Sequence, residues 1–222
     1  MNKSLNAGTD LFRNLSSEKQ EKVFQAAVGE FASKGYRGAS MNSLVKAAGI
    51  SKGSLFQYFR SKRNLFDAVL EIAVQQVKRY LKQVRAETED LSFAERLEKL
   101  LRSGFRFIDE HPLLTAVYFQ LLQSGDAPFG SDRMVQLRRQ GSEFLSDLVE
   151  RAVSKGELSP AIDVQRTGFL INSLLETLLR AYYTEFLDSG LGLYKGNSEE
   201  LDLWIKAAVN LICSGIKNNS ES

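Results

Sequence analysis

Residues 40–59 read SMNSLVKAAGISKGSLFQYF, and this stretch decides the fold of the chain. It predicts two short helices joined by a tight turn that starts at Gly49. Ser40 and Ser51 each stand directly before one of these helices, where a hydroxyl can accept a free backbone N–H of the first turn. Glycine suits the position just past a helix end, because the left-handed backbone found there is strained for residues with a Cβ atom.

Apolar residues lie four positions apart in both predicted helices, 41–48 and 52–59, so each helix has one buried face. The side chains expected to face the core are Leu44, Ala48, Leu55 and Phe59. Ile50 is apolar although it lies in the turn, which is explained if the turn is buried between the two helices. This arrangement is typical of a helix-turn-helix, whose second helix enters the major groove of DNA.

The other faces of the second helix carry small and polar residues that suit a DNA groove. Gln57 can pair with a base edge, Ser54 with either base type, and Lys52 with guanine or phosphate. Gly53 has no side chain, so the start of the helix can approach the duplex closely, and its free N–H groups favour phosphate. The remaining candidates for DNA contact are Ser40, Ser43, Ser51, Tyr58 and Lys62. A helical hairpin with a merely solvated polar face is the alternative, but the joint pattern favours DNA reading.

The segment from Glu21 to Leu70 resembles the N-terminal domain of the tetracycline-repressor (TetR-type) family. The matching residues are AAVGEFASKGYRGAS and LVKAAGISKGSLFQYFRSKRNLFDAVL. Phe56 stands where the family often has Tyr, which removes one expected phosphate contact, and Val45 stands where Ala is common. The resemblance implies a dimeric transcriptional regulator, usually a repressor, with a three-helix N-terminal reader. It also implies a C-terminal helical domain that dimerises and holds a small ligand.

Composition predicts an all-α protein of about nine helices. Of the 222 residues, 43% are hydrophobic and only three are proline. We expect residues 1–62 to form the DNA-binding helix-turn-helix domain and residues 63–222 to form the ligand-binding and dimerisation domain. The polar start predicts no secretory signal, and no apolar run is long enough to predict a membrane span. The single cysteine, Cys213, fits a reducing compartment, so a cytoplasmic location is expected.

Charge is unevenly distributed along the chain, although the net charge is only +2. Residues 1–70 carry 11 Lys and Arg against 5 Asp and Glu, whereas residues 71–222 carry 18 against 22. A basic N-terminal part and a mildly acidic remainder support a DNA reader with a separate regulatory domain.

Seven further helices are expected from apolar periodicity and from turn residues. Their approximate ranges are 18–34, 61–86, 93–110, 113–123, 131–154, 164–188 and 199–217. Ser17 and Gln20 predict a capping box for the first, and residues 1–9 predict a disordered arm. Phe12 and Leu15 are expected to dock on the first helix. The helix over 61–86 is long enough to link the reader to the second domain. Its expected buried stripe consists of Leu65, Phe66, Val69, Ala73, Val77, Leu81 and Val84.

The predicted helix over 164–188 contains FLINSLLETLLRAYYTEFL and is apolar on nearly every side. Such a helix cannot face water along much of its surface, so one face should meet the core and another a second copy of the chain. The candidate dimer residues are Leu174, Leu178, Tyr182, Trp204, Ala208 and Leu211. A helix central to a monomeric core is the alternative. A homodimer is favoured because helix-turn-helix proteins usually read two half-sites.

Glu176 and Arg180 lie four apart within this apolar run. They form either an ion pair or the polar groups of an otherwise apolar ligand pocket. The candidate ligand residues are Phe105, Tyr118, Phe119, Glu176, Arg180 and Tyr183. Three glycines inside predicted helices, Gly104, Gly141 and Gly168, allow close helix packing or leave room for a ligand.

The sequence offers little for catalysis. His111 is the only histidine and has no cysteine neighbour, so neither a metal nor a cofactor is expected. The expected partners are a double-stranded DNA operator, a small-molecule effector and a second copy of the chain. A transcriptional activator and a non-specific architectural DNA binder remain alternatives, and an enzyme on a helical scaffold is the least favoured.

Overall fold

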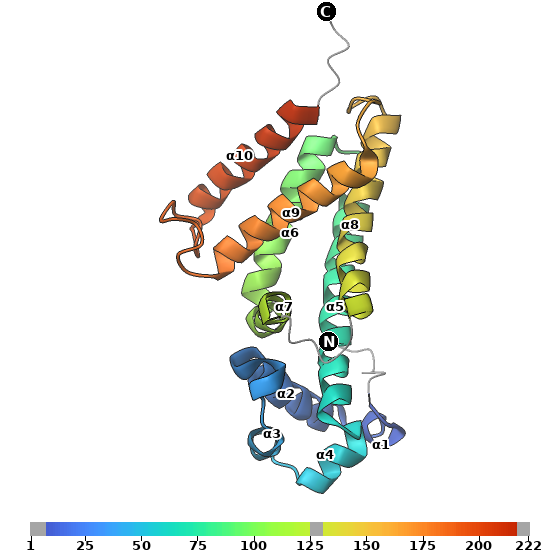
Figure 1. The fold of residues 1–222 in the computed structure, drawn as a ribbon, viewed down its shortest axis with the longest axis vertical. Coiled ribbons are helices and arrows are strands. Elements are labelled where there is room, and N and C mark those ends of the chain that lie inside the picture. The colour runs from blue at the N-terminus through green and yellow to red at the C-terminus, as the bar shows by residue number, and fades with distance from the viewer. Residues whose placement is uncertain (1–7, 125–130, 217–222) are drawn as a thin grey trace, which may run out of the picture. The chain divides into compact units, whose positions relative to one another are not determined.

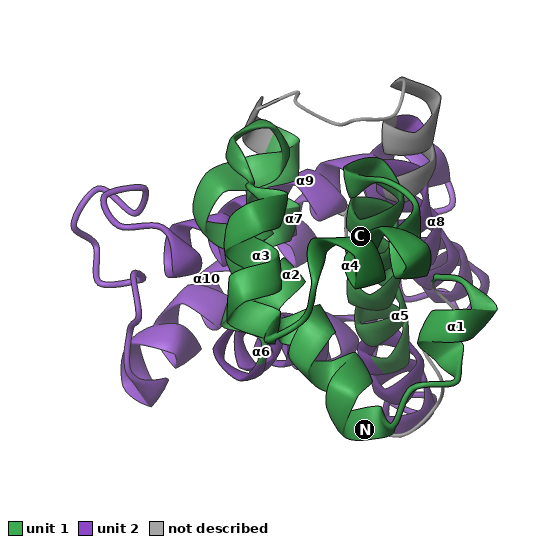
Figure 2. Cartoon of the chain, turned by 90° about the horizontal axis from the view of Figure 1, so that it is seen from below, with its two compact units in different colours: residues 1–79, 111–130 green, residues 80–110, 131–222 purple. Residues whose placement is uncertain are grey.

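The computed structural model describes residues 8–124 and 131–216, and every regular element within these ranges is a helix. The all-α fold is therefore confirmed. The chain forms two compact units, shown in two colours in Figure 2. Unit 1 comprises residues 1–79 and 111–130, and unit 2 comprises residues 80–110 and 131–222.

Unit 1 is built around the predicted helix-turn-helix (Figure 1). Its helices are α1 (Asp10–Arg13), α2 (Ser17–Gly38), α3 (Met41–Ala48), α4 (Lys52–Phe59), the first part of α5 (Lys62–Glu87) and α7 (Pro112–Ser124). α7 packs against α2, and the Gln120 side-chain amide donates a hydrogen bond to the carbonyl of Ala32 at 2.8 Å. Proline begins α7, at a position where its missing N–H has no helical partner to lose.

The start and the end of α2 both differ from the expectation. Ser16 is the N-cap and accepts from the backbone N–H of Lys19, so the capping box expected at Ser17 is wrong. The core face of α2 is formed by Val23, Phe24, Ala27 and Phe31, which are all buried. Gly35 breaks the helical backbone with φ of 64° and ψ of −178°, as expected of a helix-ending glycine, but a further turn continues to Gly38.

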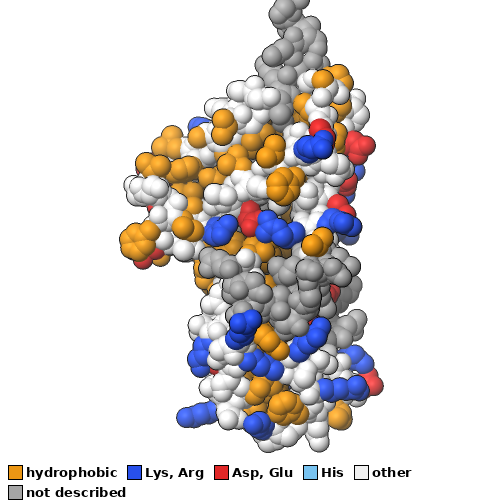
Figure 3. Space-filling model, viewed as in Figure 1, with side chains coloured by type: hydrophobic (Ala, Val, Ile, Leu, Met, Phe, Trp, Pro, Cys, Tyr) orange, Lys and Arg blue, Asp and Glu red, His pale blue; other side chains and the backbone are white. Residues whose placement is uncertain are grey.

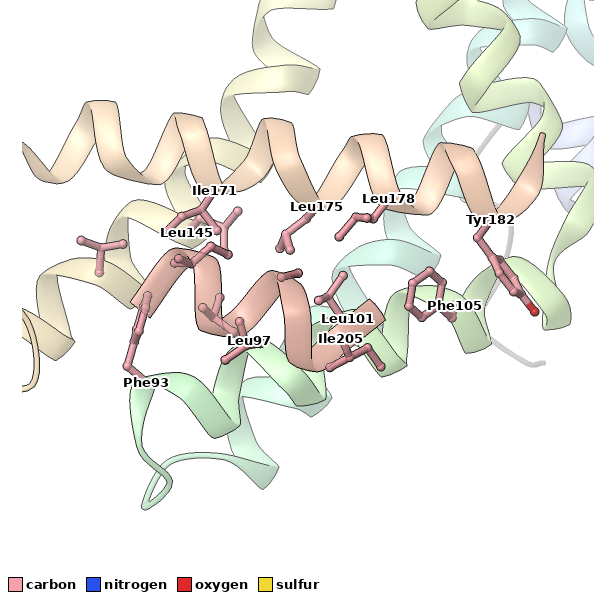
Figure 4. Close-up of a cluster of buried hydrophobic side chains, with 14 of the residues drawn as sticks. Phe93, Leu97, Leu101, Phe105, Leu145, Ile171, Leu175, Leu178, Tyr182 and Ile205 are labelled. Atoms are coloured by element: carbon pink, nitrogen blue, oxygen red, sulfur yellow. The ribbon is translucent and has the colours of Figure 1, made fainter. Parts of the chain in front are cut away.

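Unit 2 holds the rest of α5 with α6 (Phe93–Glu110), α8 (Ser131–Ser154), α9 (Val164–Tyr183) and α10 (Ser198–Ile216). Figure 4 shows its core, in which side chains of α6 and α9 face one another and meet those of α10. The apolar stripe of α6 is buried and consists of Phe93, Leu97, Leu101, Phe105 and Ile108. Ser92 and Glu95 form a capping box at the start of this helix, since the side chain of each accepts a hydrogen bond from the backbone N–H of the other.

The glycine inside α9 allows that helix to approach α8 closely. A Cβ atom at Gly168 would lie 2.9 Å from the backbone nitrogen of Ser146 and 3.0 Å from its Cα. For a Cβ atom at Gly104 the three nearest atoms all belong to the side chain of Leu179, the closest at 2.7 Å. Close packing is therefore the structural role of both glycines.

α9 ends at Tyr183, five residues before the expected end at Asp188. The Asp188 carboxylate is buried and accepts hydrogen bonds from the backbone N–H groups of Gly190, Leu193 and Tyr194, which organise a loop. These bonds hold the pKa of Asp188 below its ordinary value. A side chain that satisfies three backbone donors competes with the helix, and periodicity alone does not reveal such competition.

The long helix α5 is confirmed at 26 residues, about 39 Å at the α-helical rise. Residues of α5 belong to both units, because the division falls between Arg79 and Tyr80. Most of its expected stripe is buried, but Val77 is 41% exposed and Leu81 only half-buried. In α10 the buried positions are Ile205, Ala208, Val209 and Ile212, which form its inward face.

Candidate nucleic-acid interface

Both helices of the helix-turn-helix begin with the serine caps that the sequence predicts. The Ser40 hydroxyl accepts from the backbone N–H of Ser43 at 3.4 Å, and that of Ser51 accepts from Ser54 N–H at 3.0 Å. The turn residue Gly49 adopts the left-handed conformation, with φ of 67° and ψ of 33°. Ser40 and Ser51 therefore act first as helix caps, and a DNA contact by their hydroxyls stays a prediction.

A carboxylate that the sequence analysis missed fixes the start of α3. One Glu30 oxygen accepts from the backbone N–H of Ser40 at 2.7 Å and from the Lys34 ammonium at 2.9 Å. Partial burial disfavours the charged form, but the bonds from Ser40 and Lys34 outweigh it and hold the pKa of Glu30 below its ordinary value. The signal was weak in sequence, because Glu30 and Ser40 are ten positions apart and belong to different helices.

α4 separates a buried face from a polar one, as the sequence predicts. Leu55 and Phe59 are buried in unit 1, whereas Lys52, Gly53 and Gln57 are exposed. The fold does not require glycine at position 53, since a Cβ atom there would meet nothing closer than the Ser51 hydroxyl at 3.7 Å. The bare start of α4 therefore leaves room for a close approach by a DNA strand.

Ser54 and Tyr58 are less available than Gln57. The Ser54 hydroxyl lies 2.8 Å from the Ser51 hydroxyl, so it shares the cap of α4. Tyr58 is half-buried, and its ring centroid lies 5.7 Å from that of Phe12. Phe12 therefore docks on α4, a contact that was not expected from the sequence.

Lys62 is held by unit 1 itself. Its ammonium donates to the backbone carbonyls of Arg37 at 3.0 Å and Ala39 at 2.7 Å, and lies 5.0 Å from the ring centroid of Tyr36. These carbonyls follow the break in α2, where the helix no longer supplies partners for them. Two of the three ammonium N–H groups are thus used internally, and a phosphate contact by the third stays a prediction.

Replacing Lys62 by methionine is expected to lower the free energy of unfolding by about 1–3 kcal/mol, because two charge-assisted hydrogen bonds are lost. Methionine keeps the apolar stem, so the change isolates the ammonium. Chemical denaturation measures the effect. If stability is unchanged and only DNA affinity falls, the ammonium acts on phosphate alone.

Exposed basic side chains surround α4. Figure 3 shows Lys and Arg side chains over the part of the view that unit 1 occupies. Those exposed at or near the helix-turn-helix are Lys46, Lys52, Arg60 and Arg63. Such a distribution attracts the phosphate backbone without regard to sequence.

The six candidate ligand residues are divided between the units. Tyr118 and Phe119 lie in unit 1 with ring centroids 5.7 Å apart, and the other four lie in unit 2. Phe105 is buried in the core against Tyr182, at a centroid distance of 4.9 Å. Glu176 forms an ion pair with Arg138 of α8 at 3.3 Å, whereas the sequence suggested Arg180 as its partner. Arg180 and Tyr183 are half-buried.

A small crevice of about 20 Å³ lies in unit 2 and has room for about one water molecule. Residues of α5, α6 and α8 and of the turn after α5 line it: Val84, Arg85, Thr88, Glu89, Arg96, Leu100, Phe144, Leu148 and Arg151. It contains none of the candidate ligand residues and is far smaller than an ordinary ligand pocket. In the described part of the chain, no group of three or more His, Cys, Asp or Glu side chains is arranged to hold a metal.

The candidate dimer residues divide into buried and exposed ones. Leu178, Tyr182 and Ala208 are buried in the core of unit 2, and Leu174 and Trp204 are half-buried. Leu211 is 69% exposed. The exposed apolar residues of α9 and α10 that the sequence analysis did not single out are Phe169, Leu170 and Leu203. Figure 3 shows hydrophobic side chains gathered over these two helices.

A capped, basic helix-turn-helix in an all-α chain defines a DNA-binding protein. Residues 23–69 match the family model described as "Bacterial regulatory proteins, tetR family". Residues 23–69 therefore resemble the DNA-binding segment of tetR-family regulators, and the chain is a DNA-binding transcriptional regulator.

Similar proteins extend the likeness beyond the helix-turn-helix. The uncharacterised HTH-type transcriptional regulator YvdT of Bacillus subtilis is 25% identical over 81% of this chain and 91% of its own. The HTH-type transcriptional regulator RutR of Escherichia coli K12 is 27% identical over 70% of this chain and 71% of its own. The crystal structure of a TetR family transcriptional regulator from Chloroflexus aurantiacus is 25% identical, with a TM-score of 0.74. That match covers 96% of this chain and all of the other. No helix within the described ranges is long and apolar enough to cross a membrane.

Proposed function

We propose that this protein is a homodimeric repressor, which reads an operator with α4 and releases it when a small molecule binds. The observation that carries DNA reading is the exposed polar face of α4, which is capped by Ser51 and anchored by Leu55 and Phe59. A rigid helix with a bare, capped start offers side chains to base edges in a fixed orientation.

The exposed side chains of α4 have different roles in this proposal. Gln57 reads a base edge, because its amide can donate and accept simultaneously. Lys52 and the free N–H groups at the start of α4 bind phosphate, and Gly53 permits the close approach. Ser40, Ser43, Ser51 and Ser54 flank the phosphate strand, with Tyr58 and Lys62 near the end of the helix.

Substituting Gln57 by alanine is expected to relax base preference at one operator position, at about 1–3 kcal/mol of lost discrimination. Because no phosphate contact is removed, the salt dependence of binding should stay the same. Operators are first selected from random duplexes, and fluorescence anisotropy then compares the operator with single-base variants.

The matched control is Lys52→Ala, on the same exposed helix. It should weaken binding to all sequences alike and reduce the salt slope by about one unit. Equal effects of the two substitutions on discrimination would refute the separate roles. An unmodified protein that binds random and selected duplexes equally well would instead be an architectural DNA binder.

The dimer forms through an α9–α10 face, which we define by the exposed residues Phe169, Leu170, Leu203 and Leu211. Clustered apolar side chains of this kind mark interaction surfaces. Two copies of α4 are needed because helix-turn-helix dimers read half-sites one or more helical turns apart. The half-buried Leu174 and Trp204 lie on the same two helices and would border the contact.

The effector binds in the C-terminal helical domain, residues 63–222, and acts on the reader, residues 1–62. Glu176 supports this, because a carboxylate only 14% exposed and paired with Arg138 gives an apolar region the polar groups that orient a ligand. α5 carries the signal, since it supplies residues to both units. A coupling of about 1–3 kcal/mol is enough to change operator occupancy.

Operator release tests the repressor assignment. The selected operator is bound to the full-length protein, and fractions of a cytoplasmic small-molecule extract are added while anisotropy is followed. A fraction that releases the operator supports the proposal, and a transcription assay then distinguishes repression from activation. A cytoplasmic location is part of this proposal, because a regulator must share a compartment with its operator.

A further inference from the structure

The C-terminal end of α4 is held by a segment far away in sequence. An isolated helix leaves its last four carbonyls without partners. In α4, the carbonyls of Phe56 and Phe59 accept from the next residues of the chain, Arg60 and Ser61. The carbonyls of Gln57 and Tyr58 both accept from Thr9, 48 and 49 positions earlier, through its hydroxyl and its backbone N–H, each at 2.9 Å.

The residues around Thr9 are built for this contact. We call Gly8–Asn14 the strap, which includes α1. Phe12 is 1% exposed, and its ring centroid lies 4.6 Å from that of Phe59. Gly8 has φ of 91°, and a Cβ atom there would lie 3.1 Å from the ring of Phe59, so both its backbone and its size favour glycine.

The strap is also fastened at its other end. The side-chain amide of Gln20 on α2 donates to the carbonyls of Arg13 at 3.0 Å and Leu15 at 2.9 Å. The Arg13 guanidinium donates to the carbonyl of Gly8 at 3.1 Å, which closes the strap on itself. α4 is therefore tied to α2 through residues that lie before the matched family segment 23–69.

We propose that the strap is part of the DNA-reading apparatus, and that Thr9 is a positioning residue for Gln57. The Thr9 hydroxyl bonds to the backbone of the residue whose side chain is assigned to a base edge. It thereby fixes the rotation and the axial position of α4 before DNA arrives. Because α4 is already held in place in the free protein, DNA binding does not have to order it and loses less conformational entropy. The fixed geometry of α4 also favours the base that fits it. This inference rests on the proposed base-reading role of α4.

The test uses the full-length protein with Thr9→Val, which keeps the shape of the side chain and the extended backbone but removes the hydroxyl. The operator is selected from random duplexes with the unmodified protein. The ratio of affinities for the operator and for single-base variants is then expected to fall by about three- to tenfold, the equivalent of one hydrogen bond of ordinary strength. The salt slope should not change, because no phosphate contact is lost.

Two variants serve as controls. Thr9→Ser keeps the hydroxyl and is expected to restore the discrimination to within about twofold. Thr115→Val removes a hydroxyl bonded to a backbone carbonyl, that of His111 at 3.0 Å, in α7 of the same unit. This control makes the same chemical change away from α4 and should leave the discrimination intact.

Amide hydrogen exchange of the DNA-free protein provides an independent readout. Thr9→Val should speed exchange in the peptide that covers α4, and Thr115→Val should not. The proposal is overturned if exchange in α4 is unchanged, if discrimination is unchanged, or if specific and random duplexes weaken equally. If the unmodified protein itself shows no sequence preference, the proposed base reading fails, and the exchange result then reports on the strap alone.

Discussion

Substituting Gly168 by alanine is expected to lower the free energy of unfolding by about 2 kcal/mol. The new methyl group would lie 2.9–3.0 Å from backbone atoms of Ser146, which cannot move without shifting α8. Overpacking of this kind typically costs about 1–3 kcal/mol, and a clash with backbone atoms belongs at the upper end of that range. The better helix propensity of alanine offsets about 1 kcal/mol of this cost. Chemical denaturation of the full-length protein measures the difference.

Two other glycines provide matched controls in helices. A Cβ atom at Gly29 of α2 would meet nothing within 4 Å, so Gly29→Ala should raise stability by up to about 1 kcal/mol. The effect of Gly104→Ala on the free energy of unfolding should lie between those of Gly168→Ala and Gly29→Ala, because the Leu179 side chain near the new methyl group can change rotamer. If all three substitutions stabilise equally, α8 and α9 are not in close contact at Gly168.

Substituting Leu211 by glutamate is expected to convert the proposed dimer into a monomer at micromolar concentration. This side chain is 69% exposed in the single chain, so the charge is harmless there, but in the proposed dimer it would be desolvated against apolar residues. Operator affinity should then fall by about 10²–10⁴-fold, because a second α4 is no longer held near the second half-site. Light scattering and anisotropy measure the two effects.

Leu113→Glu on α7 is the control, since it places the same charge at an exposed leucine outside the α9–α10 face. It should leave both the molar mass and the operator affinity unchanged. A Leu211→Glu protein that stays dimeric would show that the copies meet elsewhere. A monomer that still binds the operator at full affinity would show that a single α4 is sufficient.

Local patterns in the sequence predict the helix-turn-helix almost completely. The caps at Ser40 and Ser51 and the left-handed Gly49 depend on neighbours within three or four residues, and these are visible in the sequence. The same holds for the apolar stripe of α6. The part of the site that sequence did not predict depends on distant partners, such as the bond between Thr9 and the carbonyl of Gln57.

Errors in the remaining predictions have the same physical origin. The expected end of α9 was wrong because Asp188 offers its own backbone neighbours better partners than another helical turn does. The internal acceptors of Lys62, the carbonyls of Arg37 and Ala39, were not foreseen because they are more than twenty positions away, while its phosphate contact stays a prediction. For α10, the four inward-facing positions and the two exposed leucines, Leu203 and Leu211, are all apolar, so composition could not orient the helix.

The strap has a consequence for building hybrid regulators from related proteins. A chimera that exchanges only residues 23–69 would place a foreign α4 on the native Thr9 and Phe12. The C-terminal end of the grafted α4 would then no longer match the strap that holds it. Transplanting operator recognition from this protein therefore requires the exchanged piece to begin before Gly8.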